Sequence, residues 1–274
     1  MTTARRSALP GFGPAMAITL CWVSLIVLVP LASLALRPWE LGLAGVLHSV
    51  TEPRVLAALK LSFGAAALAA SVNVPFGLLV AWVMVRYRFP GRRLADSLID
   101  MPLALPTAVA GIALTALFSP KGWIGAWLTP FGIKVAYTPL GIMVALVFVG
   151  LPFVVRTLEP VLMDLPQDAE EAAATLGATR AQTLRRVVLP ALAPALLAGF
   201  AAALARGVGE YGSVIFIAGN MPMISEIAPL LIVIRLEQLD YAGAAALGLI
   251  MLLVSFAILL LLNLLQKRMG VRVR

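Results

Sequence analysis

The stretch EEAAATLGATRAQTLRRVVLP, residues 170–190, is the one long segment of this chain whose composition does not suit a lipid bilayer. Two short runs typical of helices, at about 166–176 and 180–189, lie on either side of Gly177. A glycine at this place favours a left-handed residue that ends the first helix. The stretch therefore predicts two short polar helices on the water side of a chain that is otherwise strongly apolar.

Capping residues mark where these two helices are expected to begin and end. Asp164 can cap the first helix, with Pro166 in its first turn. Thr179 and Gln182 have the spacing of a capping box for the second helix. Pro190 is expected to end that helix where an apolar segment begins. The first helix is then a separate short helix, with a proline, Pro166, at its start and a glycine, Gly177, at its end.

The composition of the whole chain predicts a membrane protein. Of 274 residues, 61% are hydrophobic and 12% are charged, and the mean hydropathy is +1.00. Six apolar runs are each long enough to cross about 30 Å of hydrocarbon as a helix. They lie at about 15–36, 61–85, 98–119, 138–157, 190–212 and 242–266. We predict an all-α fold, with residues 1–274 forming a single transmembrane domain of six spans.

The basic residues predict the orientation of these spans. Of the 21 lysines and arginines, fourteen lie in the N-terminal segment, the loops after the second and fourth spans, and the C-terminal tail. The other loops hold six, and Arg206 falls inside the fifth span. Because basic loops stay in the cytoplasm, both termini and the loop 156–189 are expected there. The net charge of +8 is thus explained by topology and requires no nucleic acid.

Single residues argue against several kinds of site. Cys21 and His48 are each the only residue of their type, so we expect neither a disulfide framework nor a metal site. The first span follows Arg5 and Arg6 as a signal peptide would, but its apolar run of about 22 residues is longer than a signal core. We expect it to be retained as a membrane helix.

The fifth span carries two further patterns. Small residues recur every four positions and form a smooth stripe, which can pack inside the bundle, face another subunit or line a pore. They are Ala195, Gly199, Ala203 and Gly207. Arg206 and Glu210 lie one turn apart at the outer end of the span, so they can pair. Such a pair is either structural or lines the path of an anion, and Gly207, Gly209 and Gly212 would loosen the backbone beside it.

A second apolar segment, 221–241, is too short to cross the membrane. Ser225 can cap a helix that begins at Glu226. We expect a re-entrant or interfacial helix on the outer side, where it could close a pore or contact an external partner.

The opening stretch also carries a family signature. Glu171-Ala172-Ala173, Gly177, Val187 and Leu189-Pro190 have the residue types and spacing of EAA---G---------I-LP, with valine in place of isoleucine. In this respect the chain resembles the inner-membrane permeases of binding-protein-dependent ABC importers. The resemblance implies a coupling helix that sits in a cleft of a separate ATPase subunit. The residues it assigns to coupling are Glu170, Glu171, Ala172, Ala173, Leu176, Gly177, Leu189 and Pro190.

This chain has no G-x-x-x-x-G-K-[ST] loop for nucleotide phosphates. The resemblance therefore implies that ATP and Mg²⁺ bind to the partner ATPase, and that this chain binds no cofactor and is not itself catalytic.

Two longer stretches narrow the resemblance. FPGRRLADSLIDMPLALPTAVAGIAL, residues 89–114, is similar to the sulfate and molybdate permeases of the type I fold. RGVGEYGSVIFIAGNMPMISEIAPLLIVIRLEQLDYAGAAALG, residues 206–248, resembles the T-type subunit of sulfate/thiosulfate importers. The resemblance implies a bacterial inner-membrane location, a second homologous permease subunit, two ATPase subunits and a periplasmic sulfate/thiosulfate-binding protein.

Three other functions are considered. A molybdate or tungstate permease would be distinguished by the oxyanion that the reconstituted complex accumulates. An integral-membrane enzyme usually clusters His, Asp or Glu near one membrane face, and the sequence offers no such cluster. A secondary transporter would need ligands for a coupling ion at mid-membrane and often internal repeats, and neither is found.

Overall fold

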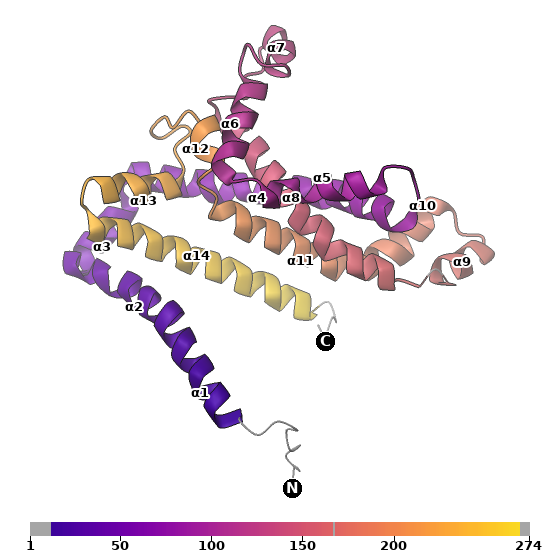
Figure 1. Cartoon of the computed structure of the whole chain (residues 1–274), viewed down its shortest axis with the longest axis horizontal. Coiled ribbons are helices and arrows are strands. Elements are labelled where there is room, and N and C mark those ends of the chain that lie inside the picture. Colours follow the sequence, from indigo (N-terminus) through magenta and orange to yellow (C-terminus); the bar gives the residue numbers. More distant parts are fainter. Residues whose placement is uncertain (1–11, 167, 269–274) are drawn as a thin grey trace.

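The computed structural model describes residues 12–166 and 168–268, and these form an elongated helical bundle without strands (Figure 1). Within them, five helices are long and apolar enough to cross a membrane, or six if one bent pair counts as a single span. The all-α membrane fold is thus confirmed. The two termini, including Arg5 and Arg6, lie outside the described residues.

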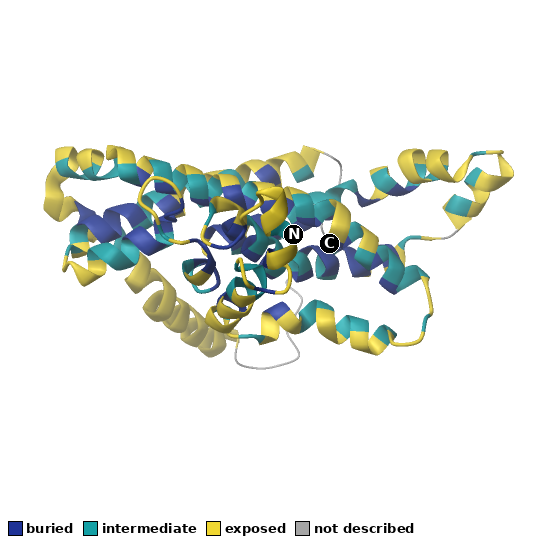
Figure 2. Cartoon of the chain, turned by 90° about the horizontal axis from the view of Figure 1, so that it is seen from above, coloured by how far each residue is buried: buried dark blue, intermediate teal, exposed yellow. Residues whose placement is uncertain are grey.

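Three long helices form the centre of the bundle: α4 (Pro53–Arg86), α8 (Pro139–Asp164) and α11 (Leu189–Val208). Small residues let their backbones approach closely, since a Cβ on Gly77 would meet the Val154 side chain at 2.7 Å. The predicted stripe on α11 is buried in this packing, and Gly199 lies against Val154. Of the three roles considered for the stripe, packing inside the bundle is therefore the one it has in this chain. Figure 2 shows the buried positions along these helices.

The third predicted span, 98–119, is not one helix. It is divided into α5 (Arg92–Ala104) and α6 (Thr107–Phe118), which meet at 110°. Pro106 forces this break, because a residue that precedes proline avoids the helical region, and Leu105 is extended with ψ 136°. As Figure 1 shows, α6 leaves the side of the bundle and leads to α7 (Gly125–Leu128) and the short helix η3 (Thr129–Phe131).

The first span continues well beyond the predicted 15–36. It comprises α1 (Phe12–Val23), the π-helical turn η1 (Ser24–Leu28) and α2 (Val29–Leu36), and then η2 (Arg37–Leu41) and α3 (Gly42–Thr51). The first three of these pieces have no buried residue. Figure 1 shows α1 projecting away from the other helices.

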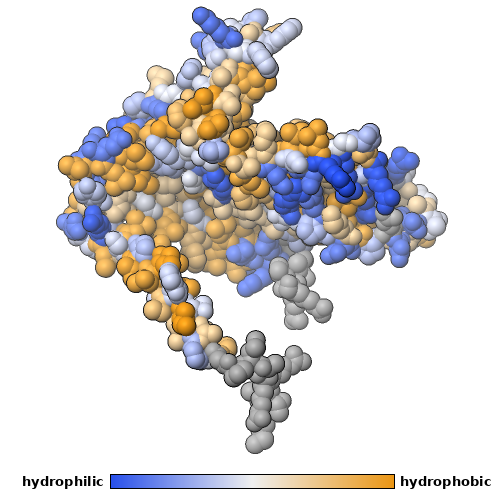
Figure 3. Space-filling view, in the orientation of Figure 1, coloured by the Kyte–Doolittle hydropathy of each residue, from blue (hydrophilic) through white to orange (hydrophobic). Residues whose placement is uncertain are grey.

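The inner loop is shorter than predicted because α8 extends to Asp164. Asp164 therefore ends a long helix and does not cap the next one, which is α9 (Asp168–Thr175). After it come α10 (Arg180–Thr183) and the π-helical turn η4 (Leu184–Val188), and these join α11 without a break. Pro190 thus lies in a continuous helix from Arg180 to Val208 and does not end one. Figure 3 shows hydrophilic side chains gathered at this end of the bundle.

The outer end is built from α3, the short α12 (Val214–Ile217), α13 (Ala228–Glu237) and the start of α14 (Tyr241–Arg268). The predicted outer helix exists but begins two residues late, with Ile227 at its N-cap. The Ser225 hydroxyl accepts from the Met221 amide at 3.0 Å and does not cap the helix. The α13 helix packs on α4 and α14 rather than lying on the surface.

Candidate functional site

The first candidate site is the short helix α9 and the turn that ends it. Gly177 has φ +81°, as predicted for a left-handed stop. Its amide donates to the Ala174 carbonyl and the Ala178 amide to the Ala173 carbonyl, each at 3.0 Å. This pair of bonds is the Schellman arrangement, which satisfies the carbonyls at a helix end. The turn fixes the direction in which the chain leaves α9.

The two sides of α9 have different surroundings. Glu171, Ala172 and Leu176 are exposed, and Leu176 is 88% accessible. We call these three residues the docking face. Glu170 and Ala173, on the other side, are half-buried against the rest of the chain. The helix therefore presents a carboxylate, a small side chain and a large apolar side chain to the solvent at the end of the bundle.

One ion pair anchors α9 to the bundle. A Glu170 carboxylate oxygen accepts from Arg86 Nη2 at 2.7 Å, and the Arg86 side chain is only 12% exposed. The Arg86 guanidinium also lies 5.4 Å from the Trp82 ring centroid. Sequence reasoning treated Arg86 only as a topology signal, because nothing in a single sequence links residues 84 positions apart.

The helix after Gly177 forms a rod that runs from the inner end into the membrane. Its capping box is confirmed: the Thr179 hydroxyl accepts from the Gln182 amide at 3.3 Å, and the Gln182 side chain accepts from the Thr179 amide at 2.8 Å. Leu189 and Pro190 lie in this rod and not on the docking face. The rod gives α9 a direct mechanical connection to α11.

The second candidate site is the end of α11. Arg206 Nη1 lies 2.5 Å from Glu210 Oε2, so the predicted pair forms. The α11 helix ends at Val208, however, so Glu210 lies beyond the helix and the pair does not form along a helical face. The other Glu210 oxygen accepts from the Ser213 amide and hydroxyl, both at 2.9 Å. Glu210 is thus fully bonded and 2% exposed, whereas Arg206 is 31% exposed.

The three glycines beside this pair have different surroundings. Gly207 packs against Ala66 of α4, and a Cβ on Gly212 would meet Thr107 Oγ1 at 2.1 Å. Both therefore permit close contact. Gly209 has open space around it and φ −89°, so its position does not require glycine. The contact of Gly212 with Thr107 brings the end of α11 to the break between α5 and α6.

Two charge clusters had not been predicted. In the inner half, Arg156 of α8 is within 2.8 Å of three carboxylates, those of Asp96, Asp100 and Glu159. Asp96 and Asp100 are one helical turn apart on α5, and that spacing was the available signal. Arg156 therefore lies inside a membrane helix, as Arg206 does.

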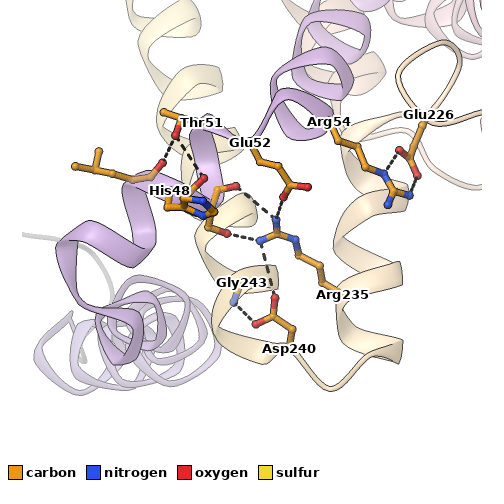
Figure 4. A network of polar contacts seen from close by, with 10 residues as sticks. His48, Thr51, Glu52, Arg54, Glu226, Arg235, Asp240 and Gly243 are labelled. Carbon is orange, nitrogen blue, oxygen red and sulfur yellow. Dashed lines mark hydrogen bonds and ion pairs between the residues drawn. The ribbon is translucent and has the colours of Figure 1, made fainter.

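The other cluster holds the outer end together (Figure 4). Arg54 donates to both oxygens of buried Glu226 at 2.8 and 2.6 Å. Arg235 bonds to Ser49 and lies 3.1 Å from Glu52. An open cavity of about 450 Å³ lies here, and its lining includes Arg54, Arg235, Ser49, Glu52 and His48. The bonds link α3, α4 and α13.

Among residues 12–166 and 168–268, no group of three or more His, Cys, Asp or Glu side chains could hold a metal ion. The site as described is a set of mechanical connections and paired charges in a multi-pass helical membrane protein. Such features are typical of membrane-embedded transport proteins with a polar loop at one end of the bundle.

Comparison with known proteins gives the family. The chain belongs to the binding-protein-dependent transport system inner membrane components, whose family model matches residues 73–271. It is 49% identical over 273 residues to the sulfate transport system permease protein CysT of Salmonella typhimurium, covering 100% of this chain and 99% of that protein. It is also 49% identical to the protein of that name in Escherichia coli K12, covering 98% and 97%.

Solved structures agree on the fold. A bacterial ABC transporter that imports the acidic polysaccharide alginate superposes with a TM-score of 0.77, covering 94% of this chain and 95% of that chain at 17% identity. The same transporter in complex with a pentasaccharide-bound periplasmic protein gives 0.77 as well, covering 93% of each chain. At this level of identity the likeness concerns the fold alone.

Proposed function

We propose that this chain forms half of the translocation pathway of an ATP-driven importer of sulfate and thiosulfate. The observation that carries the proposal is the 49% identity, over the full length of both chains, to permeases named for sulfate transport. A doubly charged anion cannot enter hydrocarbon unaided, so its import requires a protein-lined path and an energy source.

The proposed assembly contains a second homologous permease subunit, two ATPase subunits and a periplasmic sulfate/thiosulfate-binding protein in the bacterial inner membrane. The α1 helix projects away from the other helices and so leaves room for a permease partner (Figure 1). Large apolar side chains such as Trp22 of α1 and Ile26 of η1 would then face that partner or lipid. ATP and Mg²⁺ would bind to the ATPase subunits, and this chain would contribute no catalytic residue.

In this proposal the docking face of α9 inserts into a cleft of the ATPase. Leu176 would be the apolar contact, and Ala172 would allow close approach. Movement of the ATPase would pass through the rod from Arg180 to α11, whose far end carries Arg206. Binding of ATP would thereby shift the bundle between inward-open and outward-open states.

Arg206 and Glu210 are proposed to belong to the pathway or its gate. Arg206 is 31% exposed, and among the described residues its only carboxylate partner is Glu210. Guanidinium groups carry five N–H donors, so donors remain for a passing oxyanion. The position of this pair beside the α5–α6 break supports the assignment, since irregular backbone at membrane depth is tolerated where it lines a cavity or is covered by protein.

The test is transport by the purified complex in proteoliposomes, with the binding protein outside. We expect ATP-dependent accumulation of sulfate and stimulation of the ATPase by sulfate-loaded binding protein. Accumulation of molybdate or tungstate but not of sulfate would show that the importer transports the alternative oxyanion. Absence of any ATP-dependent accumulation would contradict the proposal.

A further inference from the structure

An open groove lies between the inner end of α4 and the rod that follows α9. Its volume is about 750 Å³, and its walls are mainly apolar. Leu78, Leu79 and Trp82 form the α4 side, and Leu184 and Val188 form the other. We call this cavity the inner groove. We propose that it binds one anionic phospholipid of the cytoplasmic leaflet, with an acyl chain between these walls and the head group at Arg180.

The depth of the inner groove suits a lipid. The α4 helix ends at Arg86, and Tyr87 follows it at the mouth of the groove. Trp82 lines the wall one turn deeper, with the Arg86 guanidinium 5.4 Å from its ring centroid. Tryptophan, tyrosine and arginine gather in this way at the level of lipid head groups. The apolar walls therefore continue inward from the head-group level, where acyl chains lie.

The charge at the mouth of the groove selects the kind of lipid. Two charged residues line the groove, Glu170 and Arg180. Glu170 is already paired with Arg86 at 2.7 Å, so it adds no free negative charge. Within the described parts of the chain, no carboxylate lies within 4.0 Å of Arg180. A lipid with net negative charge complements this arginine better than a zwitterionic one.

The groove lies directly behind the coupling helix. Glu170 and Ala174 of α9 line it, whereas the docking face of the same helix points away from it. A bound lipid, with its head group beside Arg180, would fill the space behind α9 and resist movement of this helix toward α4. The lipid is therefore expected to support the helix when an ATPase presses on its other side.

The experiment is native mass spectrometry of the assembled importer, titrated with phosphatidylglycerol or phosphatidylcholine. One basic residue near an anionic lipid is worth about 1 kcal/mol, which corresponds to a preference of about fivefold for phosphatidylglycerol. Arg180→Gln should abolish this preference at one binding position. Arg268→Gln, at the inner end of α14, is the matched control and should retain it.

A second variant tests the acyl-chain site without changing charge. Leu79→Trp should fill the groove and remove one retained phosphatidylglycerol per copy of this chain. Leu253→Trp, on the exposed side of α14, should retain it. Equal retention by Leu79→Trp and Leu253→Trp, or no difference between the two lipids in the unchanged complex, would overturn the proposal. The readout is lipid retention, so its result is independent of which oxyanion is transported.

Discussion

At the scale of single residues, each buried carboxylate among the described residues is paired with an arginine, which reduces the free-energy cost of placing its charge in the membrane. Glu226 is held by Arg54 and Glu210 by Arg206, and both carboxylates are 2% exposed. Pairing alone would serve a purely structural purpose. Both arginines stay partly exposed, Arg54 at 38% and Arg206 at 31%. Arg206 differs from Arg54 in its place, because it lies at the end of a central helix, beside the break between α5 and α6. This residue is therefore the one to test for a role in transport.

Replacing Arg206 separates a pathway role from a structural one. Arg206→Ala should reduce sulfate uptake by about tenfold, equivalent to about 1.4 kcal/mol at the barrier, while the complex still assembles. The double variant Arg206→Met with Glu210→Gln removes both charges and keeps an acceptor oxygen for the Ser213 amide and hydroxyl, so it should restore stability without restoring uptake. Uptake in proteoliposomes and thermal unfolding of the complex measure the two effects. Normal uptake by either variant would remove Arg206 from the pathway.

Gly177 provides a second test at this scale. Its φ of +81° is strained for any side chain, and for a β-branched one most of all. Gly177→Val should cost roughly 1–2 kcal/mol locally and misdirect α9, so that ATPase activity no longer responds to the binding protein. Gly132→Val is the matched control, because Gly132 has φ +73° and equally open surroundings but lies far from α9. If both variants couple normally, the turn at Gly177 is not needed for transmission.

At the scale of elements, prolines determine where the long helices change course. Pro106 turns the third span through 110°. Pro30 and Pro190 instead leave their helices unbroken, because each follows a π-helical turn, Ser24–Leu28 and Leu184–Val188, that absorbs the missing hydrogen bond. The sequence shows all three prolines but does not distinguish the two outcomes, which depend on what packs around each helix.

The elements also show what sequence patterns could predict. Local rules correctly located the Thr179 capping box and the Gly177 stop, since both depend on neighbouring residues. Hydropathy found the long helices but misplaced their ends, because α4 and α8 continue beyond their apolar residues as helical turns that contain polar residues. Contacts such as that of Arg86 with Glu170 join distant segments and leave no signal in one sequence.

The Arg86–Glu170 pair predicts a rescue by charge exchange. Glu170→Arg places two arginines together and should release α9, reducing sulfate-stimulated ATPase activity severalfold. Adding Arg86→Glu re-forms the pair in the opposite sense and should recover a large part of that activity. Glu171→Lys, on the docking face, should also impair coupling, but no change at Arg86 should rescue it. Rescue of Glu171→Lys by Arg86→Glu would contradict the assignment of the two faces.

The cluster at Arg156 predicts a loss of stability. Arg156→Leu would leave three carboxylates near one another without a counter-charge and should loosen α5 from α8. Because Asp96 and Asp100 are about half exposed, we expect a modest cost of roughly 1–2 kcal/mol. Arg93→Leu, at an exposed position of α5, is the control. Equal melting temperatures for the two variants would show that the cluster does not join these helices.

At the scale of the whole molecule, the chain has a polar inner end and an apolar flank that the chain itself does not cover. The inner end carries α9, and the flank includes α1 and α2 (Figures 1 and 3). The apolar flank suits contact with lipid or with another membrane helix. The family to which the chain belongs is consistent with this reading, since its members are components of a transport system.

The central claim is that α9 transmits the work of a separate ATPase to the membrane helices. Cross-linking of Leu176→Cys to the ATPase in the assembled complex tests it most directly, with Cys21→Ser to remove the native thiol. Leu239→Cys, which is 71% exposed at the outer end, is the control. We predict that Leu176→Cys forms a cross-link whose yield changes with ATP and that Leu239→Cys forms none. A Leu176→Cys residue that never cross-links to the ATPase, or that reacts only with reagents outside the cell membrane, would contradict the account.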